Sequence, residues 1–252
     1  ALISLAVIGG IAATLWQAGV ARAERARAEK RFNDVRKLAN SYLFEVYPEI
    51  ENLEGSLKAR EVILKSALEY LDSLSSEVGS DLELLSELAT AYEKVGDVQG
   101  ALNNSSLGNI KAGLESYAKA GRLREAVFTA DPTNLESKEE LANNYYTTAR
   151  TLWNKSQTQE AEEAFEKGLK LRRELAAAQP ESVEAKNRLA VLLVDYGAIP
   201  AFNFQAEKAL FLYNDAYAII NELRQKEPEN PDFKKSLTRM IRSMSKAKTA
   251  LG

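Results

Sequence analysis

The chain has 252 residues, a formal net charge of −3, and neither cysteine nor histidine. The missing residue types exclude disulfides, Cys/His zinc sites, thiol nucleophiles and catalytic triads that use histidine. Hydrophobic residues make up 45% and charged residues 27%, a balance that argues against disorder over most of the chain. An enzyme built on this chain would have to work with carboxylates, lysine, tyrosine or serine alone.

The chain opens with an uncharged stretch, Ala1 to Ala21, in which the polar side chains are Ser4, Thr14 and Gln17. As a helix this stretch is about 30 Å long, which matches the hydrocarbon core of a bilayer. Residues 1–21 are therefore predicted to form a single transmembrane helix that contacts the lipid bilayer. A signal peptide is disfavoured because no charged segment precedes the apolar run. A buried core helix is disfavoured because the stretch is far from the repeats described below.

Residues 22–47 are predicted to form a helical stalk next to the membrane. Seven basic and three acidic residues between Arg22 and Lys37 give this part a net charge of +4. Apolar residues then alternate at spacings of three and four, as in a coiled-coil seam: Phe32, Val35, Ala39, Tyr42 and Val46. This is only two heptads, so a homodimerising stalk and a helix docked on the first repeat stay equally open. Pro48 is predicted to end the helix, and a further amphipathic helix is predicted from Leu57 to Val78.

The rest of the chain, residues 57–252, carries a repeat whose period is 48. Small residues at this interval are each followed four residues later by an aromatic ring: Gly113 and Tyr117, Ala161 and Phe165, Ala209 and Tyr213. Prolines recur at the same interval, each followed by a good helix N-cap: Pro132 with Asn134, Pro180 with Ser182, Pro228 with Asn230. A small residue and a ring four residues apart lie on one helix face, where the small residue lets a second helix approach. The pattern predicts paired helices.

The order of leucine, small residue, tyrosine, small residue, aromatic residue and proline resembles the tetratricopeptide helix pair, whose period is 34. The second copy reads Leu141, Ala142, Tyr145, Ala149, Ala161, Phe165, Gly168 and Pro180. The additional residues fall into two sets of about seven, roughly two helical turns each, so each longer helix keeps its buried face. The resemblance implies an all-α, tetratricopeptide-like solenoid of helical hairpins with 48-residue long-helix repeats.

Two segments depart from the regular repeat. The first copy has five additional residues within Gly96 to Gly108, which is predicted to be a surface loop. A last helix from Pro231 to about Ala250 is a first helix without a second, and it carries six lysines and arginines but no acid after Asp232. We expect it to be a capping helix with a solvated outer face. The alternative is a site for anionic lipid, nucleic acid or an acidic partner.

The remainder of the chain is acidic. Removing the +4 of the stalk and the +6 of the last helix from the overall net charge of −3 leaves −13 for the residues between them. A nucleic-acid-binding groove would need a basic stripe. The array of repeats, residues 57–252, is therefore predicted not to bind nucleic acid.

The run from Thr14 to Glu45 resembles the segment that joins the transmembrane helix to the sensor region in bacterial membrane-anchored serine/threonine protein kinases with C-terminal tetratricopeptide repeats. The runs Leu68 to Asp81 and Tyr92 to Gly100 resemble the same group. The resemblance implies that a kinase domain precedes the span in the parent protein. This chain has no His-Arg-Asp loop, Asp-Phe-Gly motif or glycine-rich phosphate loop. It is predicted to be non-catalytic, with no catalytic, metal-binding or cofactor-binding residues.

In the tetratricopeptide family the first helix of each pair lines a concave groove. The resemblance places these residues in that groove, together with Ser86: Thr90, Glu93, Glu139, Asn143, Tyr146, Asn187, Val191 and Val194. Family members that grip C-terminal carboxylates use lysine and asparagine there. No lysine is present at these positions, which argues against such a grip. The groove is predicted to bind a protein or peptide.

These features favour a membrane-tethered recognition domain that serves as the sensor of a serine/threonine protein kinase. An assembly scaffold without an attached kinase is the alternative, and an enzyme is the least favoured reading. The kinase resemblance implies a single-pass protein of the bacterial inner membrane with an extracytoplasmic array, because the catalytic domain needs cytosolic ATP. The basic stalk points the other way, since lysine and arginine near a span favour the cytoplasmic side.

Overall fold

The structure is a computed structural model that describes residues 37, 41–50, 53, 55–100 and 106–249. Every regular element in these residues is a helix, and no strand occurs among them, as the sequence predicted. The chain divides into a first compact unit that ends at Leu71 and a second that begins at Asp72.

The first unit contains a short helical segment that packs on a longer helix. Its elements are η1 (Tyr42–Val46), α2 (Tyr47–Ile50) and the part of α3 (Leu57–Glu77) up to Leu71. The Nε of Arg60 donates a hydrogen bond of 2.8 Å to the hydroxyl of Tyr47, and the guanidinium lies 5.3 Å from the centre of that ring. Leu43 and Tyr47 are fully buried. The hydrogen bond and the contact of the guanidinium with the ring join this segment to α3.

The prediction that Pro48 ends the stalk helix is wrong. Helix α2 begins at Tyr47, contains Pro48 and ends at Ile50. Proline is tolerated in the first turn of a helix because its missing N–H has no intrahelical partner there. The π-helical turn η1 just before it breaks the α-helical register, so that Pro48 falls in a new first turn.

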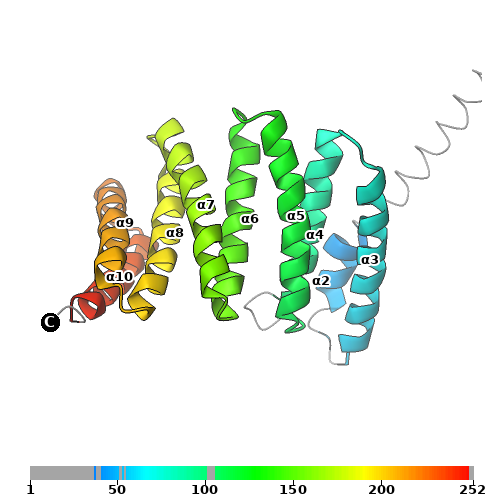
Figure 1. Ribbon diagram of the computed structural model, residues 1–252, viewed down its shortest axis with the longest axis horizontal. Coiled ribbons are helices and arrows are strands. Elements are labelled where there is room, and N and C mark those ends of the chain that lie inside the picture. Colours follow the sequence, from blue (N-terminus) through cyan, green and yellow to red (C-terminus); the bar gives the residue numbers. More distant parts are fainter. Residues whose placement is uncertain (1–36, 38–40, 51–52, 54, 101–105, 250–252) are drawn as a thin grey trace, which may run out of the picture. The chain divides into compact units, whose positions relative to one another are not determined.

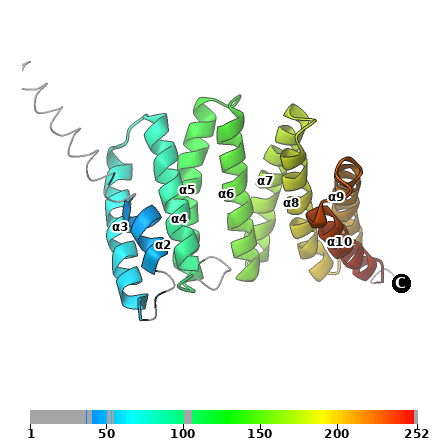
Figure 2. The same cartoon turned by 180° about the vertical axis from the view of Figure 1, so that it is seen from behind.

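The second unit is a series of helical hairpins with the predicted period. After α3 come α4 (Leu82–Gly100), α5 (Ile110–Ala130), α6 (Leu135–Asn154), α7 (Thr158–Ala178), α8 (Val183–Phe202), α9 (Ala206–Lys226) and α10 (Pro231–Thr249). The starts of α6, α8 and α10 are separated by one full period each, and so are those of α5, α7 and α9. Figure 1 shows α4 to α10 next to one another in chain order, and Figure 2 shows the same order from behind. The 48-residue helical repeat is confirmed.

The helix starts follow from the residues predicted to cap them. The side chain of Asn134 accepts hydrogen bonds from the backbone N–H groups of Glu136 and Ser137. The hydroxyl of Ser182 accepts from Ala185 in the same way. Each cap satisfies amides that lack an intrahelical partner, and so fixes where the helix begins.

Within each hairpin a small residue of the first helix faces the ring of the second. A Cβ added at Gly197 would lie 2.6 Å from Cε1 of Tyr213, and one at Gly96 would lie 2.7 Å from Cε1 of Tyr117. At the equivalent place in the middle hairpin, Ala149 is fully buried in the cluster that contains Phe165. The small–aromatic pattern in the sequence therefore sets how closely the two helices of a hairpin approach.

The predicted loop between Gly96 and Gly108 is wrong at its start, because α4 stays helical to Gly100. Residues 101–105 lie outside the described residues. The helix continues because Gly100 lies against α5: a Cβ added at Gly113 would be 3.0 Å from the Cα of Gly100. Two glycines facing each other allow this close crossing.

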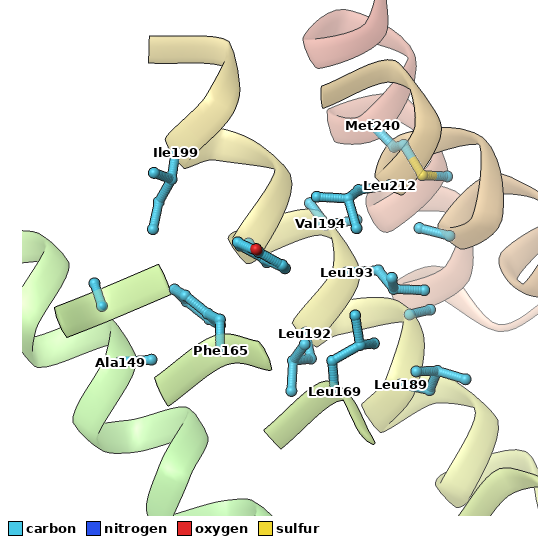
Figure 3. Packing of buried hydrophobic residues seen from close by; sticks show 14 of the residues in the cluster. Ala149, Phe165, Leu169, Leu189, Leu192, Leu193, Val194, Ile199, Leu212 and Met240 are labelled. Atoms are coloured by element: carbon cyan, nitrogen blue, oxygen red, sulfur yellow. The ribbon is translucent and has the colours of Figure 1, made fainter. Parts of the chain in front are cut away.

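The largest apolar cluster joins the second and third hairpins to α10. Figure 3 shows side chains that meet there from five helices: Ala149, Phe165, Leu169, Leu189, Leu192, Leu193, Val194, Ile199, Leu212 and Met240. The ring of Phe165 stacks on that of Tyr196 with centres 5.4 Å apart. The first hairpin contacts α6 through a smaller apolar cluster, in which Phe128 of α5 packs against Leu141 and Leu175, and through buried polar side chains that are described below.

The predicted transmembrane helix, residues 1–21, and most of the predicted stalk, residues 22–47, lie outside the described residues. In the part of the chain that is described, no helix is both long and apolar enough to cross a membrane. The span, the dimerising stalk and the place in the cell stay predictions.

Candidate functional site

The predicted groove residues lie on the first helices of the three hairpins, α4, α6 and α8. Within α6 and α8 they are spaced by four and then three residues, so those of one helix share a face. We call this set of faces the first-helix face. A pocket of about 150 Å³ opens between α4 and α6, lined by Glu93, Asp97, Tyr117, Asn143, Asn144 and Thr147. Two of the predicted residues, Glu93 and Asn143, therefore meet at one pocket.

A buried arginine from a second helix holds the polar side chains of α4 in place. Arg124 of α5 is only 3% exposed, and its guanidinium donates to Ser86 Oγ at 2.8 Å, Thr90 Oγ1 at 2.8 Å and Glu93 Oε2 at 3.0 Å. It also forms an ion pair with Glu140 of α6. One cation thus links the first helices of two successive hairpins and holds three side chains at predicted groove positions.

Burial also affects the acid that pairs with this arginine. It raises the pKa of Glu140 above its ordinary value, even though the charge of Arg124 acts in the opposite direction. The ion pair therefore compensates only part of the cost of taking the carboxylate out of water.

The same arrangement returns in the next repeat with altered partners. Arg172 of α7, also 3% exposed, donates to the carboxylate of Glu139 and to the amide oxygen of Asn143. Glu139 also forms an ion pair with a second cation, Arg188 of α8, and Arg188 pairs with Glu184 as well. Arg188 occupies the position that Glu140 holds one repeat earlier, so the charge at this position is reversed. The reversed charge is matched, because Arg188 pairs with the acid Glu139.

The third hairpin has no arginine at this position. Ile220 stands there, 1% exposed, and Val194 is only 7% exposed within the large apolar cluster. Val194 is therefore mainly a core residue, while Asn187 and Val191 remain half-buried. Along the first-helix face the side chains change from charged and polar in the first two hairpins to largely apolar in the third.

Tyr146 lies between the core and the surface. Its ring meets Phe165 edge-on at 6.3 Å, and its hydroxyl donates to Asp195 of α8 at 2.7 Å. The guanidinium of Arg150 lies 5.5 Å from the centre of the same ring. Tyr146 thus joins α6 to its neighbours in two ways: its ring packs against Phe165 of α7, and its hydroxyl binds Asp195 of α8.

Sequence reasoning missed both arginines. Arg124 and Arg172 occupy the same position in successive repeats, and each follows a repeated leucine, Leu123 or Leu171, so the signal was present in the repeat. The two arginines were missed because an arginine on a second helix is expected to be solvent-exposed unless its partners on other helices are known.

A second repeated polar motif links the first helices α4 and α6 to the helices on either side of them. The hydroxyls of Tyr92 and Tyr145 donate to carboxylates of the preceding second helix, Asp72 at 2.6 Å and Glu125 at 2.6 Å. Lys119 and its repeat equivalent Lys167 lie over these rings at 5.3 and 5.4 Å. Burial, with the hydrogen bonds to the carboxylates, raises the pKa of both tyrosines far above the ordinary value. These phenols stay protonated donors and serve packing.

Large exposed aromatic side chains lie near the turn between α8 and α9. Phe202 is 71% exposed, Phe204 89% and Phe211 61%, and the ring of Phe202 meets Trp153 edge-on at 5.5 Å. Phe204 has a positive φ of 58°, as does Ser156 at the equivalent turn one repeat earlier with 60°. No described residue covers Phe204.

The described residues contain no group of three or more histidine, cysteine, aspartate or glutamate side chains placed to hold a metal ion. The chemistry that the first-helix face offers is hydrogen bonding, ion pairing and apolar contact.

Comparison with known proteins gives no match to a protein-family model and none to a curated protein. Among solved structures, the chain is similar to BtubC (BKLC) from P. vanneervenii, with 16% identity and a TM-score of 0.48 over 89% of this chain and 85% of that one. It is similar to a putative kinesin light chain from Podosopora anserina with nearly identical TPR-like repeats, with 17% identity and a TM-score of 0.48 over 84% and 91% of the two chains. The designed helical repeat protein DHR64 matches with a TM-score of 0.28. These values assign no family. The repeat fold rests on the helices themselves.

Proposed function

We propose that the array is a protein-interaction scaffold that binds an extended segment of a partner protein on its first-helix face. The observation that carries the proposal is the pair of buried arginines, Arg124 and Arg172, which fix polar side chains at groove positions in two successive hairpins. Side chains held in one rotamer lose little entropy when a ligand binds.

Photo-crosslinking tests this proposal. A benzoylphenylalanine replaces Thr147, which lines the pocket between α4 and α6, and in a matched control replaces Ala126, which is exposed on the second helix α5. Ultraviolet light applied to cells should give a discrete crosslinked species from position 147 and none from position 126. Equal crosslinking from both positions, or none from position 147, would contradict binding on this face.

We further propose that residues 1–21 tether the array to a bacterial inner membrane and that the array is the sensor of a serine/threonine protein kinase in the parent protein. The support is the resemblance of Thr14 to Glu45 to the juxtamembrane segment of such kinases and the heptad spacing of the stalk. A single span transmits a signal most simply through a change in association, provided that the partner prefers one state. The alternative is a scaffold without an attached kinase.

Autophosphorylation of the intact parent should fall when Tyr42 and Val46 of the stalk seam are both changed to Asp. Unchanged phosphorylation together with an unchanged oligomeric state would argue that the stalk is a passive tether. A fluorescent reporter that matures only in the cytoplasm, fused after Gly252, should stay dark if the array is extracytoplasmic. A bright fusion would place the array inside.

A further inference from the structure

The last helix, α10, takes the first-helix position of a fourth repeat. It begins one full period after α8. It packs against the preceding second helix, α9, and touches the preceding first helix, α8, as α8 packs against α7 and touches α6. Its buried residues, Phe233, Met240 and Ala247, lie at spacings of seven on one side of the helix. The row of first helices therefore continues from α8 to α10, which lies in front of α9 in Figure 2.

The groove register of α10 is occupied by cations. Asn187, Val191 and Val194 of α8 correspond, in the next repeat, to Lys235, Arg239 and Arg242. The side chains of Lys235 and Arg242 are exposed, and neither forms an ion pair with a described residue. Elsewhere in the array repeated lysines are matched: Lys138 pairs with Glu174, and Lys186 with Glu222.

A solvated cap does not explain this arrangement. Cations three and four residues apart on a helix repel one another. Another face of α10, against which a further second helix would pack, already carries polar residues. Thr238 and Ser245 of α10 replace Ala190 and Gly197 of α8 there. Solubility of the cap therefore does not require cations in the groove register.

We propose that α10 binds an acidic segment of a partner protein, rich in aspartate and glutamate, at the end of the first-helix face. The inference rests on the proposed function and adds the chemistry of the partner. Glu93 and Glu139 are already paired with arginines, the groove positions of α8 are uncharged, and Lys235 and Arg242 of α10 carry charges that no described residue pairs. A segment with its acidic part on α10 is complementary to this order.

The rest of the array favours a protein segment over a larger polyanion. The residues from 38 to 233 carry a net charge of −13, so a nucleic acid or an anionic membrane laid along the array would meet repulsion outside α10. A short acidic segment can contact Lys235 and Arg242 alone.

Fluorescence anisotropy with the full 252-residue chain tests the proposal. The probe is a fluorescein-labelled twelve-residue peptide of alternating glutamate and serine, and the comparison ligands are the matching lysine–serine peptide, a short single-stranded DNA and phosphatidylserine vesicles. The variant Lys235→Glu/Arg242→Glu removes the proposed contacts. The matched control Lys111→Glu/Lys170→Glu makes the same change of charge at exposed positions on the second helices α5 and α7. Circular dichroism confirms that both variants keep their helix content.

The acidic peptide should bind the parent, lose at least about tenfold in affinity in the α10 variant, and change less than about twofold in the control. Equal losses in both variants would show that net charge alone attracts the peptide, which overturns the proposal. DNA or vesicles that bind more tightly than the peptide, with the same dependence on Lys235 and Arg242, would assign the face to another class of ligand and also overturn it. Crosslinking from position 147 that persists in the α10 variant, with no peptide binding by the parent, would refute this inference while leaving the proposed function intact.

Discussion

The arginine that joins the first two hairpins gives a sharp test of how the array is held together. Changing Arg124 to Ile introduces the residue that the third hairpin has at the same position, Ile220. The guanidinium is 3% exposed, while its carboxylate partners Glu93 and Glu140 are 25% and 29% exposed. The substitution leaves both carboxylates without their cation between α4 and α6.

Removing one member of a buried ion pair typically costs about 3–5 kcal/mol. Because both carboxylates retain some contact with water, we expect Arg124→Ile to lower the free energy of unfolding by about 2–4 kcal/mol, somewhat less than that typical cost. The triple variant Arg124→Ile/Glu93→Gln/Glu140→Gln removes the uncompensated charges and should recover at least half of the loss.

Urea unfolding followed by circular dichroism at 222 nm measures these differences. Arg122→Ile on the same helix is the control, because Arg122 is exposed and surface changes usually stay within about 0.5 kcal/mol. If Arg124→Ile unfolds like the control, or if the triple variant is no more stable than the single one, the arginine does not join the hairpins as described.

Three further changes test separate parts of the structure. Gly197→Ala places a Cβ 2.6 Å from Cε1 of Tyr213 and should cost about 1–3 kcal/mol in urea unfolding; an unchanged midpoint would mean that the ring moves freely. Phe204→Asn replaces an exposed ring at φ 58° with a residue that tolerates this conformation, and should raise stability by about 0.5–1 kcal/mol; a loss would reveal a contact of Phe204. The hydrogen bond from Lys186 lowers the pKa of Glu222 below its ordinary value, so its stabilisation is present above the unfolded-state pKa and is lost as the pH falls through the folded-state value. Between pH 5 and 3, Glu222→Gln should therefore lose less stability than the parent, and equal losses would argue against this ion pair.

The period and the helix starts could be predicted because they depend on local chemistry that recurs. Asn134 and Ser182 are residue types that favour the N-cap position, and Ala161 and Gly197 must be small for a neighbouring helix to pack closely. A repeat also checks each assignment against two other copies. The hairpin arrangement follows from these residues alone.

The detailed character of the first-helix face could not be predicted in the same way. Whether Val194 faces a ligand or the core depends on Ile220 replacing an arginine on another helix, and the orientation of Thr90 depends on Arg124, 34 residues away. Such side-chain partnerships depend on tertiary geometry, which spacing along one helix does not contain. The helical extension to Gly100 likewise depends on its contact with Gly113 of the next helix.

The most direct test of the proposed binding surface is to find which helices a bound partner protects from amide hydrogen exchange. Hydrogen–deuterium exchange is measured with and without the partner that is captured through position 147. Slower amide exchange should appear in the first helices α4, α6 and α8, and the second helices α5, α7 and α9 should be little changed. Protection concentrated on the second helices, or none on α6, would contradict the claim that the first-helix face is the binding surface.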